Sequence, residues 1–444
     1  MVIAIDTLRA DHLSCYRYPR LTSPHLDRFA AQGALFEEAY SEYIPTHPGY
    51  TTLFTGKDVF THQIVTQGGK VDLAPEVRQL AEVLQEQGYF TGAADNLGRW
   101  FKRGFEEYKT YRWEQRGTEW RKAEAVNAAF LSLLNRAAQE AQWGTPFFLF
   151  AHYWDPHTPY LPPAPFSRMF YTGNEKDPSN RSMDPVFAFE PFTQYFQQWM
   201  GGVTDIRFPR AQFDAEIAYV DSALAHVFTR LDTLGLSEDT LVIVTSDHGE
   251  VLDEHPCWFD HHGLYEENIH VPLLMRLRGR IPAGKRIPGF ARLQDVAPTI
   301  LEAIGLTEVA AEERMEGRSL WQEATSTEAR RVPTEALYLA ECTWMRKRGW
   351  RTREWKLIQG LEPDIHDFPP LELYNLKDDP GEQRNLAESR PEVATDLLSR
   401  MEQHAARRLA ATGLPDPVQT QSITLRKIGS MRTAVPEDQK LDQT

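Results

Sequence analysis

Short apolar runs alternate with longer amphipathic runs along most of this chain, and this alternation limits the fold more than any other feature. The short runs predict buried strands, whereas the longer runs repeat apolar residues with a helical period. The predicted strands are residues 2–6, 34–40, 89–94, 145–154, 240–249 and 270–276. The predicted helices are residues 23–33, 48–54, 77–88, 119–142, 215–235 and 293–305. This pattern predicts an α/β fold in which helices cover both faces of a large, mostly parallel sheet.

The texture of the sequence changes after about residue 325, where strand-like runs separated by turns replace the alternation. We expect residues 1–325 to form one large α/β domain and residues 326–412 to form a small C-terminal α+β subdomain. Residues 413–444 are polar and weakly patterned, which favours an extended tail and a candidate contact for a homo-oligomer. Residues 163–209 carry ten aromatic residues without clear periodicity. We interpret them either as a surface excursion or as a lid or pocket wall at a substrate site.

Charge and composition exclude several classes of partner. The net charge is −15 and no basic run is present, so nucleic acids and anionic membranes are not expected to bind. There is no uninterrupted apolar run of about 18 residues and no visible signal peptide, which favours a cytoplasmic protein, although a leader removed from the sequence would not be seen. The three cysteines are too few and too scattered for a disulfide framework. We expect a small anionic molecule as the ligand.

Acidic residues and histidines lie at or just after the ends of three predicted strands, and Asp155 and His157 follow the strand of residues 145–154. Asp6 ends the first strand, and Asp247 and His248 end the strand of residues 240–249. In a parallel sheet, functional groups gather outside the carboxyl ends of the strands. With a hydroxyl group these side chains would form an O/N site for Mn²⁺, Zn²⁺ or Fe²⁺ in preference to Mg²⁺ or Ca²⁺. The alternative interpretation is that Asp247 caps a turn and that His248 is a core histidine.

A threonine lies between two prolines in the segment YIPTHPGYTTLFTG, residues 43–56. The hydroxyl of Thr46 becomes a nucleophile only if a metal ion holds it or a base removes its proton. A helix that starts just after Pro48 would direct its amino-terminal amides at an anion beside Thr46. The alternative is that Thr46 only caps that helix.

Further histidines are candidates for acid catalysis or for a second metal ion. Prolines fix the backbone around His157, which could protonate a leaving oxygen. His261 and His262 form a pair that could contact the substrate, bind a metal ion or lie idle on a surface loop. We therefore consider one ion or two, with Asp155, His157 and His262 as ligands of the second.

Seven motifs occur in an order that resembles the sulfatase family of the alkaline phosphatase superfamily. They are IDTLRADHLSCY, TSPHLDRFAAQGALFEEAYS, TLFTGKDVFTHQIV, HYWDPHTPYLPP, VTSDHGEVLDEH, LYEENIHVPLL and LYNLKDDPGEQRNLA. The resemblance covers residues 2 to about 388 and implies an α/β sandwich around a large mixed sheet, with a smaller C-terminal subdomain. By position it implies that Asp6, Asp247 and His248 bind a metal ion and that His157 lies beside the leaving group. His261 stands where many members have a substrate-binding lysine.

The departures from this family concern the nucleophile and its surroundings. The formylglycine signature, C/S-x-P-x-R, reads Thr46-His47-Pro48-Gly49-Tyr50 here, so the formylglycine hydrate mechanism is excluded. The threonine loop resembles that of phosphodiesterases in the same superfamily, in which an asparagine holds a phosphoryl oxygen at the position of Gln67. The candidate substrate-binding residues are Thr7, Tyr50, Gln67, Asn96 and His262.

The resemblance and the departures together predict a metal-dependent hydrolase of phosphate or phosphonate esters. In this hypothesis a metal-bound Thr46 attacks phosphorus, and His157 or His261 protonates the departing alkoxide. The alternatives are a sulfatase without formylglycine, a phosphoryl-group transferase and a non-catalytic binding protein of the same fold.

Overall fold

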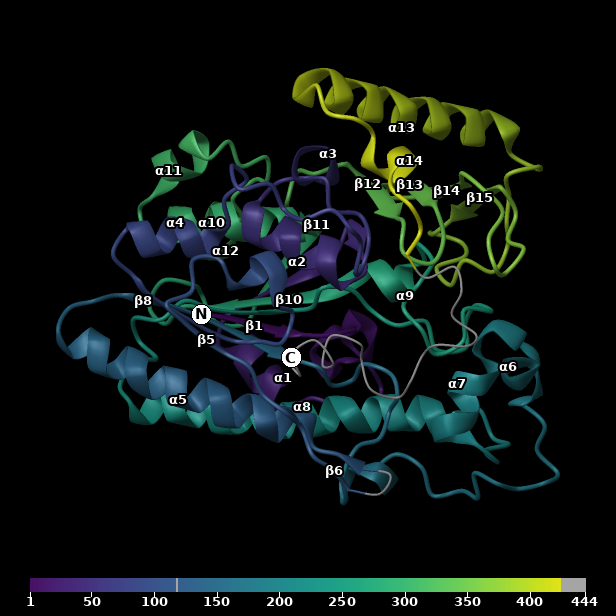
Figure 1. The fold of residues 1–444 in the computed structure, drawn as a ribbon, viewed down its shortest axis with the longest axis horizontal. Helices are drawn as coiled ribbons and strands as arrows, with labels where there is room; N and C mark the ends of the chain where they lie inside the picture. The colour runs from purple at the N-terminus through teal and green to yellow at the C-terminus, as the bar shows by residue number, and fades with distance from the viewer. Residues whose placement is uncertain (117–118, 425–444) are drawn as a thin grey trace.

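The computed structural model describes residues 1–116 and 119–424, and an eight-stranded sheet forms its centre (Figure 1). The strand order is β11-β2-β10-β9-β1-β8-β4-β5. The strands are β1 Val2–Ile5, β2 Ala34–Tyr40, β4 Phe90–Ala94, β5 Glu107–Lys109, β8 Phe147–Tyr153, β9 Val242–Thr245, β10 His270–Arg276 and β11 Lys285–Arg292. In this sheet β10 runs antiparallel to both neighbours, and the other pairs are parallel. The predicted large, mostly parallel sheet is therefore confirmed.

Helices cover both faces of this sheet, as the alternation in the sequence predicts. Alternate residues of β1 face opposite sides: Ile3 and Ile5 join one hydrophobic core, and Val2 and Ala4 join the other. One face is covered by α1 Pro24–Ala31, α5 Lys122–Gln142 and α8 Arg207–Thr233, of which α5 and α8 lie side by side (Figure 1). The other face is covered by α2 Thr46–Thr55, α4 Leu80–Glu86, α10 Val296–Ala303 and α12 Trp321–Thr325.

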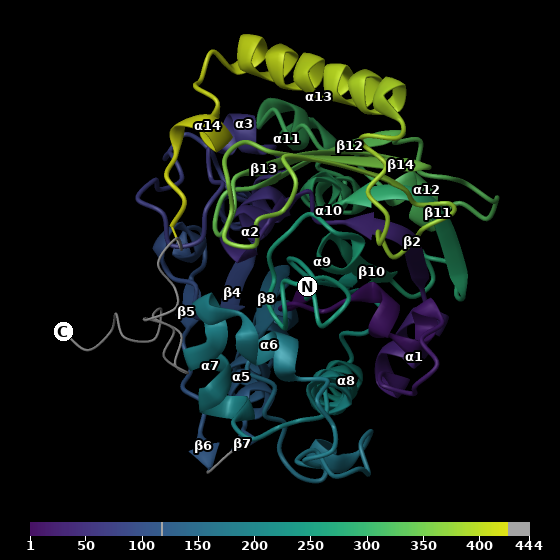
Figure 2. The same ribbon diagram turned by 90° about the vertical axis from the view of Figure 1, so that its right-hand side faces the viewer.

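A second sheet of five strands lies beside the first, in the order β15-β14-β13-β12-β3. Its strands are β3 Tyr43–Ile44, β12 Ala336–Glu341, β13 Lys347–Thr352, β14 Trp355–Gly360 and β15 Leu371–Asn375. Figure 2 shows the long helix α13, Pro391–Thr412, lying across this sheet, with Leu397 and Met401 buried against it. β3 pairs in parallel with β12. The chain just before Thr46 therefore belongs to the smaller sheet.

The aromatic segment of residues 163–209 is more regular than its sequence suggests. It contains α6 Asp184–Ala188 and α7 Glu190–Met200, and α8 begins inside it at Arg207, earlier than predicted. Phe192 and Phe196 are buried in the same core as Ile3 of the central sheet. Amphipathic helices therefore replace the irregular excursion, and their aromatic side chains pack on the main body.

The remaining elements are short and connect the larger ones. They are α3 Val59–His62, α9 Glu266–Ile269, α11 Thr307–Glu312, α14 Pro417–Thr420, β6 Gln115–Arg116 and β7 Glu119–Trp120. β7 takes the start of the predicted helix 119–142, so α5 begins only at Lys122. The predicted tail includes α14, and residues 425–444 lie outside the described residues.

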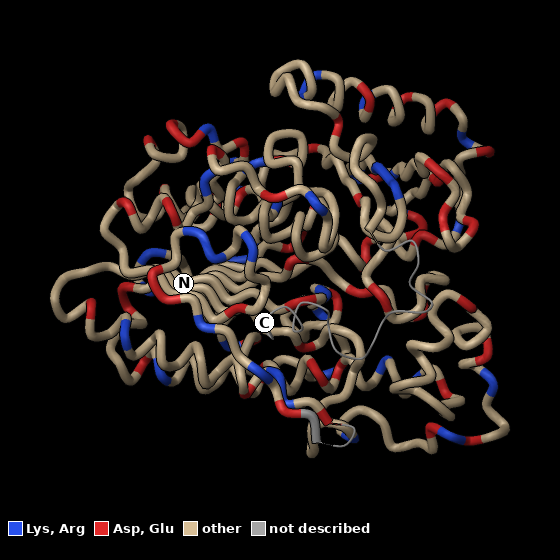
Figure 3. Tube along the Cα trace, viewed as in Figure 1, with Lys and Arg blue, Asp and Glu red and all other residues tan. Residues whose placement is uncertain are grey.

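Acidic and basic residues mix along α5 and α13 (Figure 3). In the described part of the chain, we find no helix with the length and apolarity needed to span a membrane.

Candidate functional site

Three acidic and histidine side chains meet where neighbouring parallel strands end. Asp6 follows β1, and Asp247 and His248 follow β9, which pairs with β1 in parallel. One ligand atom of each residue lies within 4.8 Å of the other two, and all three side chains are fully buried. The predicted convergence of these strand ends is present, and it brings together donors that could hold one metal ion.

Thr46 is the first residue of α2 and lies against this group. Its Oγ1 is 3.2 Å from His248 Nε2. The same nitrogen is 3.3 Å from Asp247 Oδ2 and 3.7 Å from Asp6 Oδ1. A Cβ atom on Gly49, in the first turn of α2, would lie 2.8 Å from the carbonyl oxygen of Asp247. Glycine therefore permits the close approach that presses the start of α2 onto the strand-end residues.

The donor atoms of this group suit a divalent cation. Asp6 Oδ1 and Asp247 Oδ2 are buried and accept no hydrogen bond in the described structure. Burial, followed by the charge of Asp6, raises the pKa of Asp247 to about 6. His248 Nδ1 donates to the carbonyl of Gly249 at 2.8 Å, which leaves the lone pair of Nε2 facing the carboxylates. Oxygen and imidazole donors of this kind fit Mn²⁺, Zn²⁺ or Fe²⁺.

A buried histidine that was not predicted from the sequence, His152, contacts the carboxylate of Asp6. His152 Nε2 lies 3.3 Å from Asp6 Oδ2, and His152 Nδ1 lies 2.9 Å from Asp95 Oδ1. Burial alone would lower the pKa of His152, but the bonds to Asp6 and Asp95 raise it to about 10. The imidazolium therefore orients Asp6 and offsets its charge. The position of Asp95, directly after a predicted strand, was the available signal.

The two predicted proton donors lie next to the metal-ligand group. The ring of His261 stacks on His248 with centroids 4.8 Å apart, and the ring of His157 is 4.9 Å from His261. His157 Nδ1 donates to the carbonyl of Thr158 at 2.6 Å, which fixes the orientation of its ring. The structure thus places two imidazoles beside the metal-ligand group.

The predicted substrate-binding residues differ in how they are placed. Gln67 lies at the start of α2, where its Oε1 accepts a hydrogen bond from the His47 amide at 2.9 Å. Thr7 and Tyr50 are buried, and neither hydroxyl has a hydrogen-bond partner in the described structure. Asn96 instead binds the backbone of Tyr111 through both Nδ2 and Oδ1. The amide that we expected to contact the substrate therefore joins the segment after β4 to the segment after β5.

The second metal site expected from Asp155, His157 and His262 does not form. Among the described residues, the ligand atoms of these three side chains do not all lie within 4.8 Å of one another. Asp155 Oδ1 instead pairs with Lys122 Nζ at 3.3 Å, with both side chains buried. His262 Nε2 lies 2.6 Å from His366 Nε2. Asp155 is thus neutralised by a lysine, and His262 faces a different partner.

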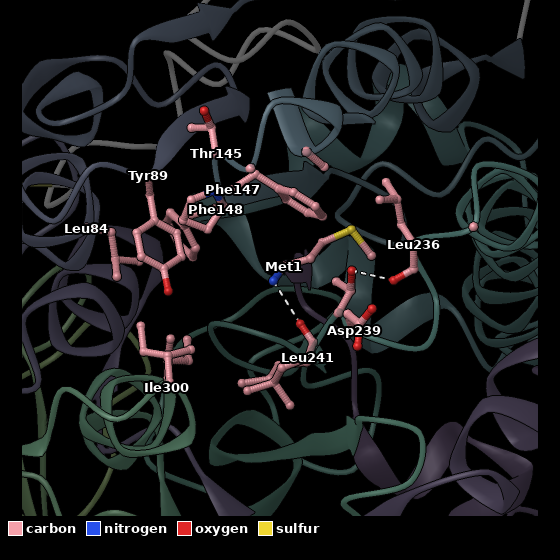
Figure 4. Close-up of a pocket in the computed structure, with 17 residues that line it drawn as sticks. Met1, Leu84, Tyr89, Thr145, Phe147, Phe148, Leu236, Asp239, Leu241 and Ile300 are labelled. Carbon is pink, nitrogen blue, oxygen red and sulfur yellow. Dashed lines mark hydrogen bonds between the residues drawn. The ribbon is translucent and has the colours of Figure 1, made fainter. Parts of the chain in front are cut away.

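An apolar cavity of about 360 Å³ lies at the opposite, amino-terminal end of the central strands (Figure 4). Met1, Tyr89, Phe148 and Ile300 are among its lining residues. None of the candidate site residues lines it, so it is separate from the strand-end centre.

Most of the chain matches models of known protein families. The model of the family named Sulfatase matches residues 1–306, and the model of the N-sulphoglucosamine sulphohydrolase C-terminal region matches residues 253–407.

Two curated proteins are similar to the chain over different lengths. PehA of Trinickia caryophylli, a multifunctional alkaline phosphatase superfamily protein, is 26% identical over 379 residues, covering 69% of this chain and 73% of PehA. Arylsulfatase K of Rattus norvegicus is 30% identical over 236 residues, covering 50% of this chain. The alignment spans 40% of the length of the rat enzyme.

A similar fold occurs in the phosphonate monoester hydrolase from Silicibacter pomeroyi, with a TM-score of 0.71 and 22% sequence identity. The match covers 93% of this chain and 96% of that chain. At this level of identity the likeness concerns the fold.

Proposed function

The chain belongs to the sulfatase family of ester hydrolases in the alkaline phosphatase superfamily, and we propose that it cleaves phosphate diesters or phosphonate monoesters with Thr46 as the nucleophile. The observation that carries this proposal is the 3.2 Å distance between Thr46 Oγ1 and His248 Nε2, beside the carboxylates of Asp6 and Asp247. Members of this superfamily depend on metal ions, and these four residues would hold one.

The bound ion would supply Lewis acidity and lower the pKa of the Thr46 hydroxyl. Thr46 would lose its hydroxyl proton to solvent, and Oγ1 would form a bond to phosphorus while the bond from phosphorus to the ester oxygen breaks. His157 or His261 would donate a proton to the departing alkoxide. In a second step water would attack the phosphorus of the threonine ester, which keeps the second substituent of the substrate, break the bond to Oγ1 and return a proton to that histidine. The amides at the start of α2 and the side chain of Gln67 would hold the oxygens of the phosphoryl group.

The nucleophile argues against the usual sulfatase reaction. Formylglycine forms from cysteine or serine, and the β-methyl group of Thr46 prevents oxidation to that aldehyde. A threonine alkoxide can instead form a phosphoester that water later cleaves. This difference favours a phosphorus centre over a sulfate ester.

The charges around the site favour a substrate with one negative charge. A divalent ion would balance the two carboxylates that hold it, and Asp95 lies against the His152 imidazolium. The Lys122 ammonium is already paired with Asp155. Because the ion is balanced by its own carboxylates, net positive charge for the substrate would come from a protonated imidazole of His157 or His261. A phosphate diester or phosphonate monoester carries one charge and matches this supply.

A second candidate function is hydrolysis of a sulfate ester by threonine. It is favoured by the match of residues 253–407 to the C-terminal model of a sulphohydrolase and by the similarity to arylsulfatase K. Sulfate monoesters also carry one negative charge, so charge alone does not separate the two candidates.

The decisive experiment compares an aryl phosphate diester, an aryl phosphonate and an aryl sulfate on the metal-loaded protein. We expect turnover of the first two to exceed that of the sulfate. Acid quenching followed by mass spectrometry should find the phosphoryl or phosphonyl group, with its remaining substituent, on the peptide that contains Thr46. Thr46→Ala should lose at least about 10³-fold in kcat, whereas Thr46→Ser should retain most activity. Full turnover by Thr46→Ala would refute the nucleophile assignment, and preferred sulfate cleavage would favour the second candidate.

A further inference from the structure

A second group of potential metal ligands lies beside the candidate site, on residues that have no step in the proposed reaction. Cys257 and His262 lie between β9 and α9, whereas His366 lies between β14 and β15. One ligand atom of each residue lies within 4.8 Å of the other two. Cys257 and His262 are fully buried and His366 is half-buried. Three donors from two distant parts of the chain therefore meet at one point.

The two imidazoles already face each other in a geometry close to that of a metal site. His262 Nε2 and His366 Nε2 are 2.6 Å apart, and their ring planes differ by 22°. A tetrahedral zinc ion, with Zn–N bonds of about 2.0–2.1 Å, would hold the two nitrogens about 3.3 Å apart. A small rotation of each ring makes room for the ion between them.

The surroundings of these donors resemble the outer shell of a metal site. His262 Nδ1 faces Asp260 Oδ1 at 3.6 Å, just beyond hydrogen-bond range, and metal-bound histidines commonly direct the second ring nitrogen at a carboxylate. Phe189 stacks on His366 with ring centroids 4.5 Å apart, and Trp344 lies 5.3 Å from the ring of His262. The aromatic rings exclude water from the donors and limit how far they can move.

Hydrogen bonds to buried acids hold both loops in place. The His366 amide donates to Asp364 Oδ1 at 2.9 Å, and Asp364 Oδ2 lies 3.4 Å from the buried ammonium of Lys347. The Gly263 amide, next to His262, donates to Glu341 Oε2 at 2.7 Å. The donors are therefore positioned before any ligand binds.

We propose that Cys257, His262 and His366 bind a thiophilic divalent cation of the zinc class, separate from the ion at the strand ends. One thiolate and two neutral imidazoles are donors that zinc prefers and that Mg²⁺ and Ca²⁺ avoid. Binding releases the thiol proton of Cys257 to solvent.

The position of this second centre suggests what it does for the first. His261 precedes His262 directly, and its ring stacks on His248 at 4.8 Å. An ion at the second centre would tie the loop that carries His261 to the loop of the smaller sheet that carries His366. It thereby fixes the position of one of the two imidazoles on the leaving-group side.

The test uses the full chain, stripped of metal and titrated with Co²⁺ in place of zinc. The strand-end centre contains no sulfur ligand, so a thiolate-to-cobalt charge-transfer band reports the second centre alone. We expect this band in the parent protein, bleaching of the band by Zn²⁺, and two bound ions per chain. Cys257→Ser and His366→Ala should each lose the band and one ion. Asp247→Asn should keep the band and lose the other ion.

The matched control is Cys15→Ser, which changes a cysteine outside the group and should retain both the band and two ions. His366 lies in a half-buried loop position, so His366→Ala is the variant best suited to keep its fold, which circular dichroism checks. Absence of the band in the parent protein would overturn the proposal, as would a band that survives both Cys257→Ser and His366→Ala. Neither measurement depends on turnover, so failure here is distinct from failure of the proposed function.

Discussion

Replacement of Lys122 by methionine should be among the most destabilising single changes near the site. Lys122 Nζ lies 3.3 Å from Asp155 Oδ1 and donates to the carbonyls of His157 at 3.2 Å and Trp154 at 3.4 Å. Lys122 and Asp155 are both buried, so the substitution leaves a carboxylate in the interior without its cation. Removing one partner of a buried ion pair costs about 3–5 kcal/mol. Lys122→Met should lower the free energy of unfolding by that amount.

The assay is urea unfolding at neutral pH, followed by tryptophan fluorescence. The double variant Lys122→Met/Asp155→Asn should recover part of the loss, because it removes the uncompensated charge as well. Lys377→Met, at an exposed position, is the control and should stay within about 0.5 kcal/mol of the parent. A loss below about 1 kcal/mol for Lys122→Met, or no recovery in the double variant, would refute the view that Lys122 compensates a buried charge on Asp155.

Three further predictions concern leaving-group protonation, metal binding and pH. His157→Gln should slow the hydrolysis of alkyl esters by about 10²–10⁴-fold but affect nitrophenyl esters much less, because nitrophenolate leaves without a proton; equal losses on both substrates would exclude acid catalysis by His157. A divalent ion should be added to the metal-stripped protein at 100 times its dissociation constant for the strand-end site. It should raise the free energy of unfolding, measured in urea, by about 2.7 kcal/mol more in the parent protein than in Asp247→Asn. An equal increase in both proteins would place that ion elsewhere. Burial raises the pKa of Glu42 to about 8 in the folded protein, so the folded state holds this proton where the unfolded chain has released it. Glu42 should therefore contribute a loss of roughly 1.4 kcal/mol of stability per pH unit between about pH 5 and pH 8, and Glu42→Gln should remove that contribution from the slope; an unchanged slope in the variant would contradict the assignment.

The metal-ligand group was predictable because its residues follow strands that the sequence marks clearly. Asp6 and Asp247 end strongly apolar runs, and parallel strands bring such ends to one edge. The partnership of His152 with Asp95 was not predictable in the same way. It joins residues 57 positions apart and depends on the pairing of β4 with β8, in which Ala94 lies opposite Ala151. A single sequence carries no record of that register.

The structure also shows which contacts two predicted substrate-binding residues make. Asn96 and His262 both follow apolar segments and carry polar groups, which made them candidates for substrate contact. Asn96 instead bonds to the backbone of Tyr111, and His262 faces His366 across about a hundred positions of sequence. The first contact comes from the pairing of β4 with β5, and the second from the packing of the smaller sheet against the larger one; local patterns encode neither.

The short strand β3 makes the two sheets depend on each other for catalysis. It pairs with β12 of the smaller sheet and leads directly into Thr46, whereas α2 packs against the larger sheet. A fragment cut near residue 325 would keep the candidate metal ligands but lose the strand that aligns the residues before Thr46. Changes far along the chain, in the C-terminal region, can therefore adjust where the Thr46 hydroxyl lies without altering any of the residues proposed to bind the ion.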